Sequence, residues 1–358
     1  GFVNEYEQIK SVLWCPGTGQ SGFEGLGEIL SGQVNPSGKT SDTFVLDLTT
    51  TPTANNFGNF TYDNMEEFKV TQTGFTGKEE ITWPSFVNYV EGIYAGYRFY
   101  ETAAAEGLID YDSTVLYPFG YGLSYTTFEQ SMGEITEDNG QITFDVTVTN
   151  TGDTAGKDVI EVYYNPPYTN GGIEKATANL IAFDKTDILE PGTSQTLTIS
   201  FKEEEMASYD YQNVKGYVLE AGDYRISINS DSHNVLAEQT FTVDTTVEYT
   251  GENGRSSDTA AVTNVFDYAA GEVTYLSRAD GFANYKEATA APASLTMKED
   301  VKETFINNSN YHPEDYNLGD DAMPTTGAKN SIQLADLRGA EYDDPKWETL
   351  LDNMTISD

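Results

Sequence analysis

The chain has 358 residues, with 58 acidic and 19 basic side chains and a formal net charge of −39. A charge of this sign and size repels nucleic acids and anionic membrane surfaces, but it does not oppose the binding of neutral molecules such as sugars. Aromatic residues make up 13% of the sequence, too many for general disorder, and the length allows two domains with separate cores.

The sequence offers few residues that could hold a metal ion or a cofactor. Cys15 is the only cysteine, so the chain forms no internal disulfide, and the two histidines, His233 and His312, lie far apart in the sequence. Because no Cys or His cluster has the spacing of metal ligands, we expect no metal and no cofactor. No run of about 18 apolar residues occurs, so we also expect no membrane-spanning segment in this stretch.

The first predicted elements are a strand, a glycine-rich loop and a helix. An apolar run at residues 10–16 predicts the strand, whereas Phe23, Leu26 and Leu30 recur on one helical face and predict a helix that Gly32 would end. The loop approximates the G-x-G-x-x-G pattern of nucleotide-binding proteins, but no βαβ unit with a later acidic residue completes that pattern. We therefore expect one βα unit of an α/β layer.

The next stretch, residues 33–88, is polar and has little periodicity, so irregular surface segments with short strands are expected. Residues 89–100 then concentrate four tyrosines and Phe99 around Glu91 and Arg98. Tyrosines beside an arginine can form a platform for a sugar, but a packed aromatic segment with a charge pair is the default interpretation.

Short strands are predicted between residues 128 and 244. Apolar and polar residues alternate here, and Pro-Gly and Asn-Thr-Gly-Asp turns separate the runs. The predicted strands cover residues 142–149, 159–164, 180–183, 196–201, 216–219 and 224–228. Strands of this number and length are typical of an immunoglobulin-like sandwich.

The alternation ends after residue 244. Residues 245–332 predict an extended linker, with local order where Phe266, Tyr275 and Phe282 dock on a surface. The final stretch, residues 333–358, predicts a helix that starts at a proline. The apolar side chains on one face of that helix are Trp347, Leu350, Leu351 and Met354.

Three motifs resemble family-three glycoside hydrolases. The first consists of Trp14-Cys-Pro-Gly17 and Asn35-Pro-Ser-Gly-Lys39, which resemble the end of that family's α/β sandwich domain. The second consists of residues 89–100 and Tyr117-Pro-Phe-Gly-Tyr-Gly-Leu-Ser-Tyr-Thr126, which resemble the segment leading into a fibronectin III-like domain. The third, residues 343–355, is similar to the helix that opens the family's catalytic barrel.

Because the barrel-like motif comes last, the order resembles the permuted subgroup of the family. The resemblance implies α/β plus all-β architecture in four parts. They are the C-terminal part of an α/β sandwich domain (1–127), a fibronectin III-like β-sandwich (128–244), a linker (245–332) and the start of a catalytic (β/α) barrel (333–358). We therefore expect an interior piece of a larger protein.

The resemblance implies the accessory portion of a retaining β-glycosidase that hydrolyses terminal non-reducing β-D-glucosyl or related residues. Such enzymes use two carboxylates roughly 5 Å apart. In the family these lie in the barrel and upstream of the Trp14 motif, so we expect no catalytic residue here and no activity of this portion alone. Glu24, Glu91 and Glu101 match no catalytic motif. The candidates for contact with an oligosaccharide or β-glycoside at the rim of the active site are Trp14, Glu91 and Arg98.

Two other functions remain open from the sequence: a non-catalytic cell-surface module that binds carbohydrate or protein, and an inactive homologue of the hydrolases. A secreted or cell-surface bacterial location is expected, with a cytoplasmic location as the alternative. The composition predicts no particular oligomer.

Overall fold

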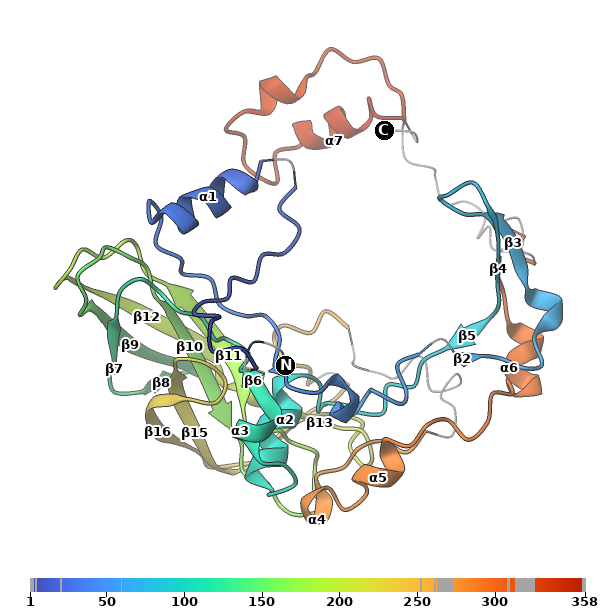
Figure 1. Ribbon diagram of the computed structural model, residues 1–358, viewed down its shortest axis with the longest axis horizontal. Coiled ribbons are helices and arrows are strands. Elements are labelled where there is room, and N and C mark those ends of the chain that lie inside the picture. Colours follow the sequence, from blue (N-terminus) through green and yellow to red (C-terminus); the bar gives the residue numbers. More distant parts are fainter. Residues whose placement is uncertain are drawn as a thin grey trace. The chain divides into compact units, whose positions relative to one another are not determined.

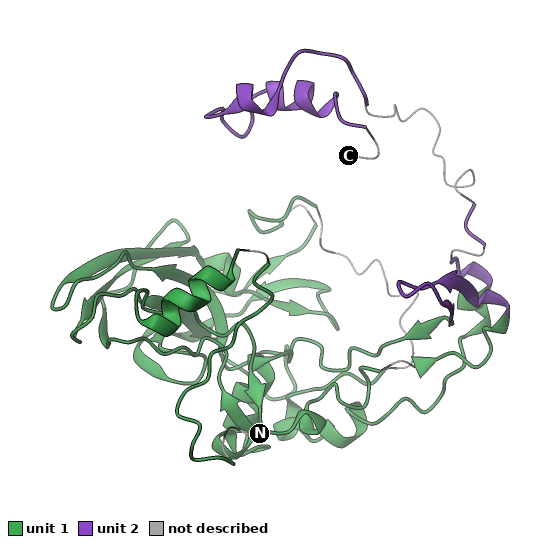
Figure 2. Ribbon diagram, turned by 45° about the horizontal axis from the view of Figure 1, so that its top comes forward, with its two compact units in different colours: residues 1–66, 83–302 green, residues 67–82, 303–358 purple. Residues whose placement is uncertain are grey.

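The computed structural model of the chain divides into two compact units, one formed by residues 1–66 and 83–302 and the other by residues 67–82 and 303–358 (Figure 2). The residues that the structure describes are 3, 5–19, 21–58, 60–251, 253–260, 262, 273–307, 310–312 and 326–355.

The first unit contains a β-sandwich (Figure 1). One sheet has the order β11-β10-β15-β16, the other has the order β12-β9-β7 with β8 beside β9, and a small third sheet has the order β13-β14-β17. The strands are β7 (Phe128–Met132), β8 (Thr136–Asp138), β9 (Gln141–Asn150), β10 (Val159–Asn165), β11 (Asn179–Lys185), β12 (Ser194–Lys202), β13 (Ser208–Asp210), β14 (Gly216–Leu219), β15 (Gly222–Asn229), β16 (Val235–Val243) and β17 (Val247–Tyr249), with the 3₁₀ helix η4 at Glu203–Met206.

Alternating side chains explain these strands. In β9, Ile142, Phe144, Val146 and Val148 are buried in the sandwich core, whereas the polar residues between them face outward. Each strand predicted between residues 128 and 244 is confirmed, but the prediction misses the short strands β7, β8, β13 and β17 and the longer strand β16. Strand β16 lies at the edge of its sheet, and its apolar pattern is weak because Val235 and Leu236 are both exposed and the polar Gln239 stands on the inward face.

An α/β part precedes the sandwich in the first unit. Its elements are α1 (Phe23–Ser31), β1 (Phe44–Val45) paired with β6 (Val115–Tyr117), η2 (Leu48–Thr50), β2 (Phe60–Thr61) paired with β5 (Ser85–Phe86), α2 (Tyr97–Ala105) and α3 (Tyr111–Thr114). The predicted helix is confirmed as α1, and Gly32 ends it at φ 78° by donating its N–H to Glu28 and Ile29 carbonyl oxygens.

The predicted strand at residues 10–16 is wrong, since the structure assigns no regular element there. A strand requires a neighbour for its backbone N–H and C=O groups, and no described strand pairs with this run. The apolar face of α1 is likewise uncovered, with Phe23 68% and Leu30 71% exposed.

The tyrosine-rich segment forms a second core around α2. Tyr94, Phe99, Tyr100 and Ala103 are buried there, as expected of a packed aromatic segment, and Phe282 from the region after the sandwich packs among them. The predicted docking is confirmed for Phe282, whereas the Tyr275 side chain is 46% exposed and Phe266 lies outside the described residues. The later helices of this region are α4 (Ala279–Phe282), α5 (Tyr285–Ala288) and α6 (Glu299–Thr304).

The second unit contains the hairpin of β3 (Val70–Thr73) and β4 (Glu79–Thr82), the 3₁₀ helix η7 (Leu334–Leu337) and α7 (Lys346–Leu351), with the 3₁₀ helix η3 (Glu66–Phe68) at the junction of the units. The helix predicted near the chain end is confirmed as α7, and Pro345 precedes its first residue. Among the described residues, no helix is long and apolar enough to cross a membrane.

Candidate functional site

The three residues predicted from the sequence as rim candidates have separate environments. Trp14 is 67% exposed and its ring meets the edge of Phe44 at a centroid distance of 5.4 Å. Glu91 is buried, and one of its carboxylate oxygens has no hydrogen-bond partner; the same holds for the Nε of Arg98. No hydrogen bond, ion pair or ring contact joins any two of these three described residues, so the expected charge pair of Glu91 and Arg98 is absent.

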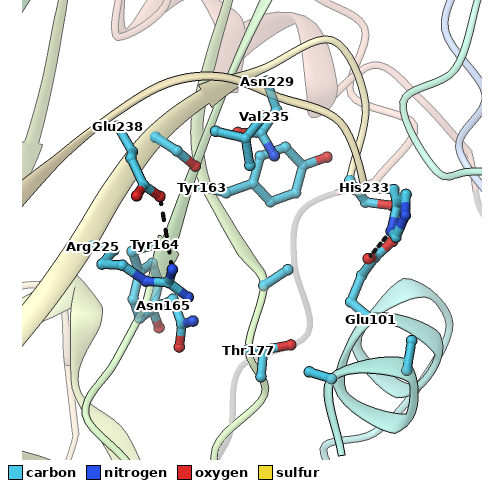
Figure 3. Close-up of a pocket in the computed structure, with 15 residues that line it drawn as sticks. Glu101, Tyr163, Tyr164, Asn165, Thr177, Arg225, Asn229, His233, Val235 and Glu238 are labelled. Atoms are coloured by element: carbon cyan, nitrogen blue, oxygen red, sulfur yellow. Dashed lines mark hydrogen bonds and ion pairs between the residues drawn. The ribbon is translucent and has the colours of Figure 1, made fainter. Parts of the chain in front are cut away.

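A cavity of about 400 Å³ lies in the first unit, between the C-terminal half of α2 and one sheet of the sandwich (Figure 3). Strands β10, β15 and β16 supply one wall, and α2 with the turn between β15 and β16 supplies the other. Two hydrogen bonds tie α2 to the sandwich beside the cavity, from the Leu180 N–H to the Tyr97 hydroxyl (2.9 Å) and from the Thr177 N–H to Thr102 Oγ1 (3.0 Å). The cavity therefore sits at the junction of the α/β part and the sandwich.

Glu101, on α2, connects these two parts through its carboxylate. The hydroxyls of Tyr111 and Ser232 donate to Oε1 at 2.7 and 2.8 Å, and His233 Nδ1 lies 2.8 Å from Oε2. The His233 ring also stacks on Tyr111 with a centroid distance of 3.6 Å. Because Glu101 is only 8% exposed, these contacts are sheltered from water and the carboxylate has an anchoring role.

The same contacts change the acidity of the residues around Glu101. Its hydrogen bond and negative charge raise the pKa of His233, against the opposing effect of partial burial. Burial, followed by the negative charge of Glu101, raises the pKa of Tyr111 well above its usual value. The protonated imidazole and the neutral phenol are thus the forms that stabilise this contact.

Other polar groups of the cavity belong to the sandwich. Arg225 Nη1 lies 3.8 Å from Glu238 Oε2 on the neighbouring strand, and both side chains are about half exposed. When the side-chain amide of Asn165 is turned so that its oxygen faces Arg225, this oxygen accepts a hydrogen bond from Arg225 Nη2 at 2.5 Å. Asn229 is 2% exposed and its Oδ1 has no hydrogen-bond partner, which is an unusual arrangement for a buried acceptor.

A second buried carboxylate, Glu161 on β10, lies beside the cavity wall. It accepts a hydrogen bond from the Tyr163 hydroxyl at 2.8 Å and is 4% exposed. Burial raises the pKa of Glu161 to about 7, although the Tyr163 hydrogen bond and Lys39 oppose that rise. Glu161 is therefore a group that titrates near neutral pH.

Glu161→Gln should remove a pH dependence of stability. A carboxyl group with a folded pKa of about 7 and an unfolded pKa of 4.5 stabilises the fold fully below pH 4.5, and this contribution of about 3 kcal/mol is lost as the pH rises through 7. Relative to the wild type, we expect Glu161→Gln to gain stability between pH 5 and pH 8. Urea denaturation at several pH values checks this, and a difference that is independent of pH would contradict it.

Gly120 determines how closely the backbone can approach Glu161. It has φ 81°, and an added Cβ would collide with the Glu161 carboxylate. We expect Gly120→Ala to lower the free energy of unfolding by about 2–4 kcal/mol, from backbone strain and overpacking together. Gly192→Ala is the matched control, because Gly192 has φ 76° and open space around it. Equal losses in urea denaturation would show that the close approach contributes nothing.

Metal ligation has no visible support in the described ranges, where no three His, Cys, Asp or Glu side chains could hold an ion together. In the sequence, Glu101 is only a carboxylate that matches no catalytic motif, and His233 is only one of two histidines. Their contact joins residues 132 positions apart, so no local pattern could reveal it. The cavity and the roles of Arg225 and Asn229 likewise could not be predicted from the sequence.

Comparison with protein families identifies both parts of the first unit. The glycosyl hydrolase family 3 C-terminal domain matches residues 2–125, and the fibronectin type III-like domain matches residues 158–232. The first match is to a domain of glycosyl hydrolases, and the second covers part of the sandwich that follows it. Residues 2–232 therefore belong to glycosyl hydrolase family 3, which confirms the resemblance of the first two motifs and the expected α/β plus all-β fold class.

Individual relatives agree with this assignment. A β-glucosidase of Ruminococcus albus is 36% identical over 251 residues, covering 69% of this chain and 23% of that protein, and β-glucosidase A of Butyrivibrio fibrisolvens is 34% identical over 264 residues, covering 65% and 28%. The solved β-glucosidase from Paenibacillus barengoltzii is similar with a TM-score of 0.51 and 33% identity, covering 63% of this chain and 22% of its own. The chain thus spans about a quarter of the length of these curated relatives.

The relatives do not share one sugar. A protein of Bifidobacterium longum that is 31% identical over 233 residues, covering 64% of this chain and 26% of that protein, is named an exo-α-(1->6)-L-arabinopyranosidase. Similarity therefore leaves the sugar specificity open.

Proposed function

We propose that this chain is the accessory portion of a retaining β-glycosidase that hydrolyses terminal non-reducing β-D-glucosyl or related residues. The observation that carries the proposal is the match of two family domains in succession, shared with relatives named β-glucosidases. In this proposal the substrate is an oligosaccharide or β-glycoside. The α/β part and the sandwich support a barrel that holds the substrate.

The two catalytic carboxylates are proposed to lie outside this chain. Retaining hydrolysis requires a nucleophile and an acid/base about 5 Å apart. The buried Glu101 is occupied by three donors, and Glu24 is exposed on α1. Both environments suit structural or surface roles rather than that of a catalytic pair.

Hydrolysis of p-nitrophenyl β-D-glucopyranoside by residues 1–358 and by the full-length gene product tests the proposal. We expect activity only in the longer protein. Glu24→Gln in the longer protein should leave kcat unchanged, since this carboxylate lies on the surface of α1. Activity of residues 1–358 alone, or a large loss of kcat in Glu24→Gln, would place a catalytic carboxylate within this chain.

We further propose the permuted order, in which residues 1–127, 128–244 and 245–332 precede a barrel that begins within 333–358. The start of α7 directly after Pro345 supports this, because the barrel-opening motif requires a helix there. A structure of the full-length protein with the barrel elsewhere in the sequence would refute it. For localisation we propose secretion or cell-surface display, which fractionation of the native cells would test.

A further inference from the structure

We propose that the cavity between α2 and the sandwich is a carbohydrate-binding site in its own right, which takes one neutral sugar unit through Arg225 and Asn229 (Figure 3). The choice of a sugar rests on the proposed function. The existence of a binding site rests on the cavity and its unpaired acceptor.

The cavity has the size and position of a small-molecule site. Its volume of about 400 Å³ falls within the range of roughly 300–1,000 Å³ that ligand pockets occupy, and such pockets often lie at the junction of two domains. Hydrogen bonds from the sandwich to α2 fix the relation of the two walls, so the cavity is formed before a ligand arrives.

The buried acceptor Asn229 Oδ1 indicates what the ligand must offer. An acceptor in a residue that is 2% exposed is costly to leave without a donor, and none of the residues that the structure describes supplies one. Asn229 lines the cavity, but its Oδ1 is buried, so the side-chain amide must turn toward the cavity before a donor of the ligand can reach it. A sugar hydroxyl fits this requirement, because it both donates and accepts.

The charges of the cavity compensate one another, which favours a neutral ligand. Arg225 faces Glu238, and His233 faces Glu101, so each cation has an anion beside it when His233 is protonated. The formal charge of the whole chain is −39, yet no excess of either sign remains in this cavity to hold a charged ligand. Half-exposed Arg225 and Glu238 still have donors and acceptors to offer to hydroxyl groups.

Apolar surface completes the site. Tyr163, Tyr164 and Val235 line the cavity together with the polar groups. Aromatic rings bind the C–H face of a sugar while hydrogen bonds fix its orientation, and a few polar groups on an apolar wall are typical of specific pockets.

Binding of cellobiose to residues 1–358, measured by isothermal titration calorimetry and ligand-observed NMR, tests the proposal. We expect saturable binding that is weakened about tenfold or more by Arg225→Ala and by Asn229→Leu. Arg225→Ala changes a half-exposed side chain and so keeps the test valid even if Asn229→Leu does not fold. Arg338→Ala, on an exposed residue of the second unit, is the charge-matched control and should bind like the wild type.

Three results would overturn the proposal. They are no binding at tens of millimolar ligand, equal affinity in the wild type and Arg225→Ala, or tighter binding of glucuronate than of glucose. Because binding is measured without hydrolysis, these results are independent of the glycosidase assay. A chain without affinity for sugars is compatible with an active full-length enzyme, and a chain that binds sugars is compatible with an inactive one.

Discussion

Replacing Glu101 with alanine should lower the free energy of unfolding by about 3–5 kcal/mol, because the change leaves the donors of Tyr111, Ser232 and His233 facing a buried gap. It also removes the side chain that connects α2 to the turn between β15 and β16. Urea denaturation measures the loss. The same change should lower the pKa of His233 toward its ordinary value, which NMR titration of the two histidines measures directly.

The pH dependence of this effect has a definite sign. A histidine whose folded pKa is raised adds stability that is present below its unfolded pKa and is lost as the pH rises through the folded value. The difference between the wild type and Glu101→Ala should therefore be larger at pH 6 than at pH 9. Glu134→Ala, a change at an exposed position, is the control. A loss in Glu101→Ala no greater than in this control would disprove the anchoring role.

The sandwich could be predicted because its core strands alternate buried apolar residues with exposed polar residues along the sequence. In β9 the buried Ile142, Phe144, Val146 and Val148 alternate with polar residues, so period two identifies both the strand and its inward face. In edge strand β16 the contrast is weaker, because two exposed apolar residues begin the strand and Gln239 interrupts its inward apolar face, so a prediction based on alternation misses it. Residues 10–16 show the opposite error, since apolar composition predicts a strand but only a paired neighbour makes one.

The candidate site could not be predicted for a different reason. Trp14, Glu91 and Arg98 were predicted as site residues because they lie in recognisable motifs. In the structure, none of the three contacts another of them. The residues that do meet, Glu101 and His233, come from α2 and from the turn after β15. Their approach depends on how the α/β part packs on the sandwich, and this tertiary relation leaves no periodicity or spacing in the sequence.

Phe282 is one of the buried residues by which the region after the sandwich packs against α2, together with Leu276 and Ala288. Its ring meets those of Tyr94 and Phe99 at centroid distances of 5.0 and 6.0 Å, and it is 1% exposed. The backbone of Phe282 has φ 61°, following Asp280 at 51° and Gly281 at 67°. Left-handed conformations are costly for residues other than glycine, so the packing of the ring must offset that strain.

Phe282→Ala should therefore cost about 3–5 kcal/mol in urea denaturation, because it removes a fully buried aromatic ring. Trypsin should also cleave faster at Arg278 or Lys286, on either side of the freed ring. Tyr275→Ala is the matched control, since a side chain that is 46% exposed should contribute less than about 0.5 kcal/mol. If the two variants unfold alike, the segment around Phe282 is not part of the cooperative fold. The packing of the Phe282 ring would then contribute nothing to the free energy of unfolding of the sandwich and α2.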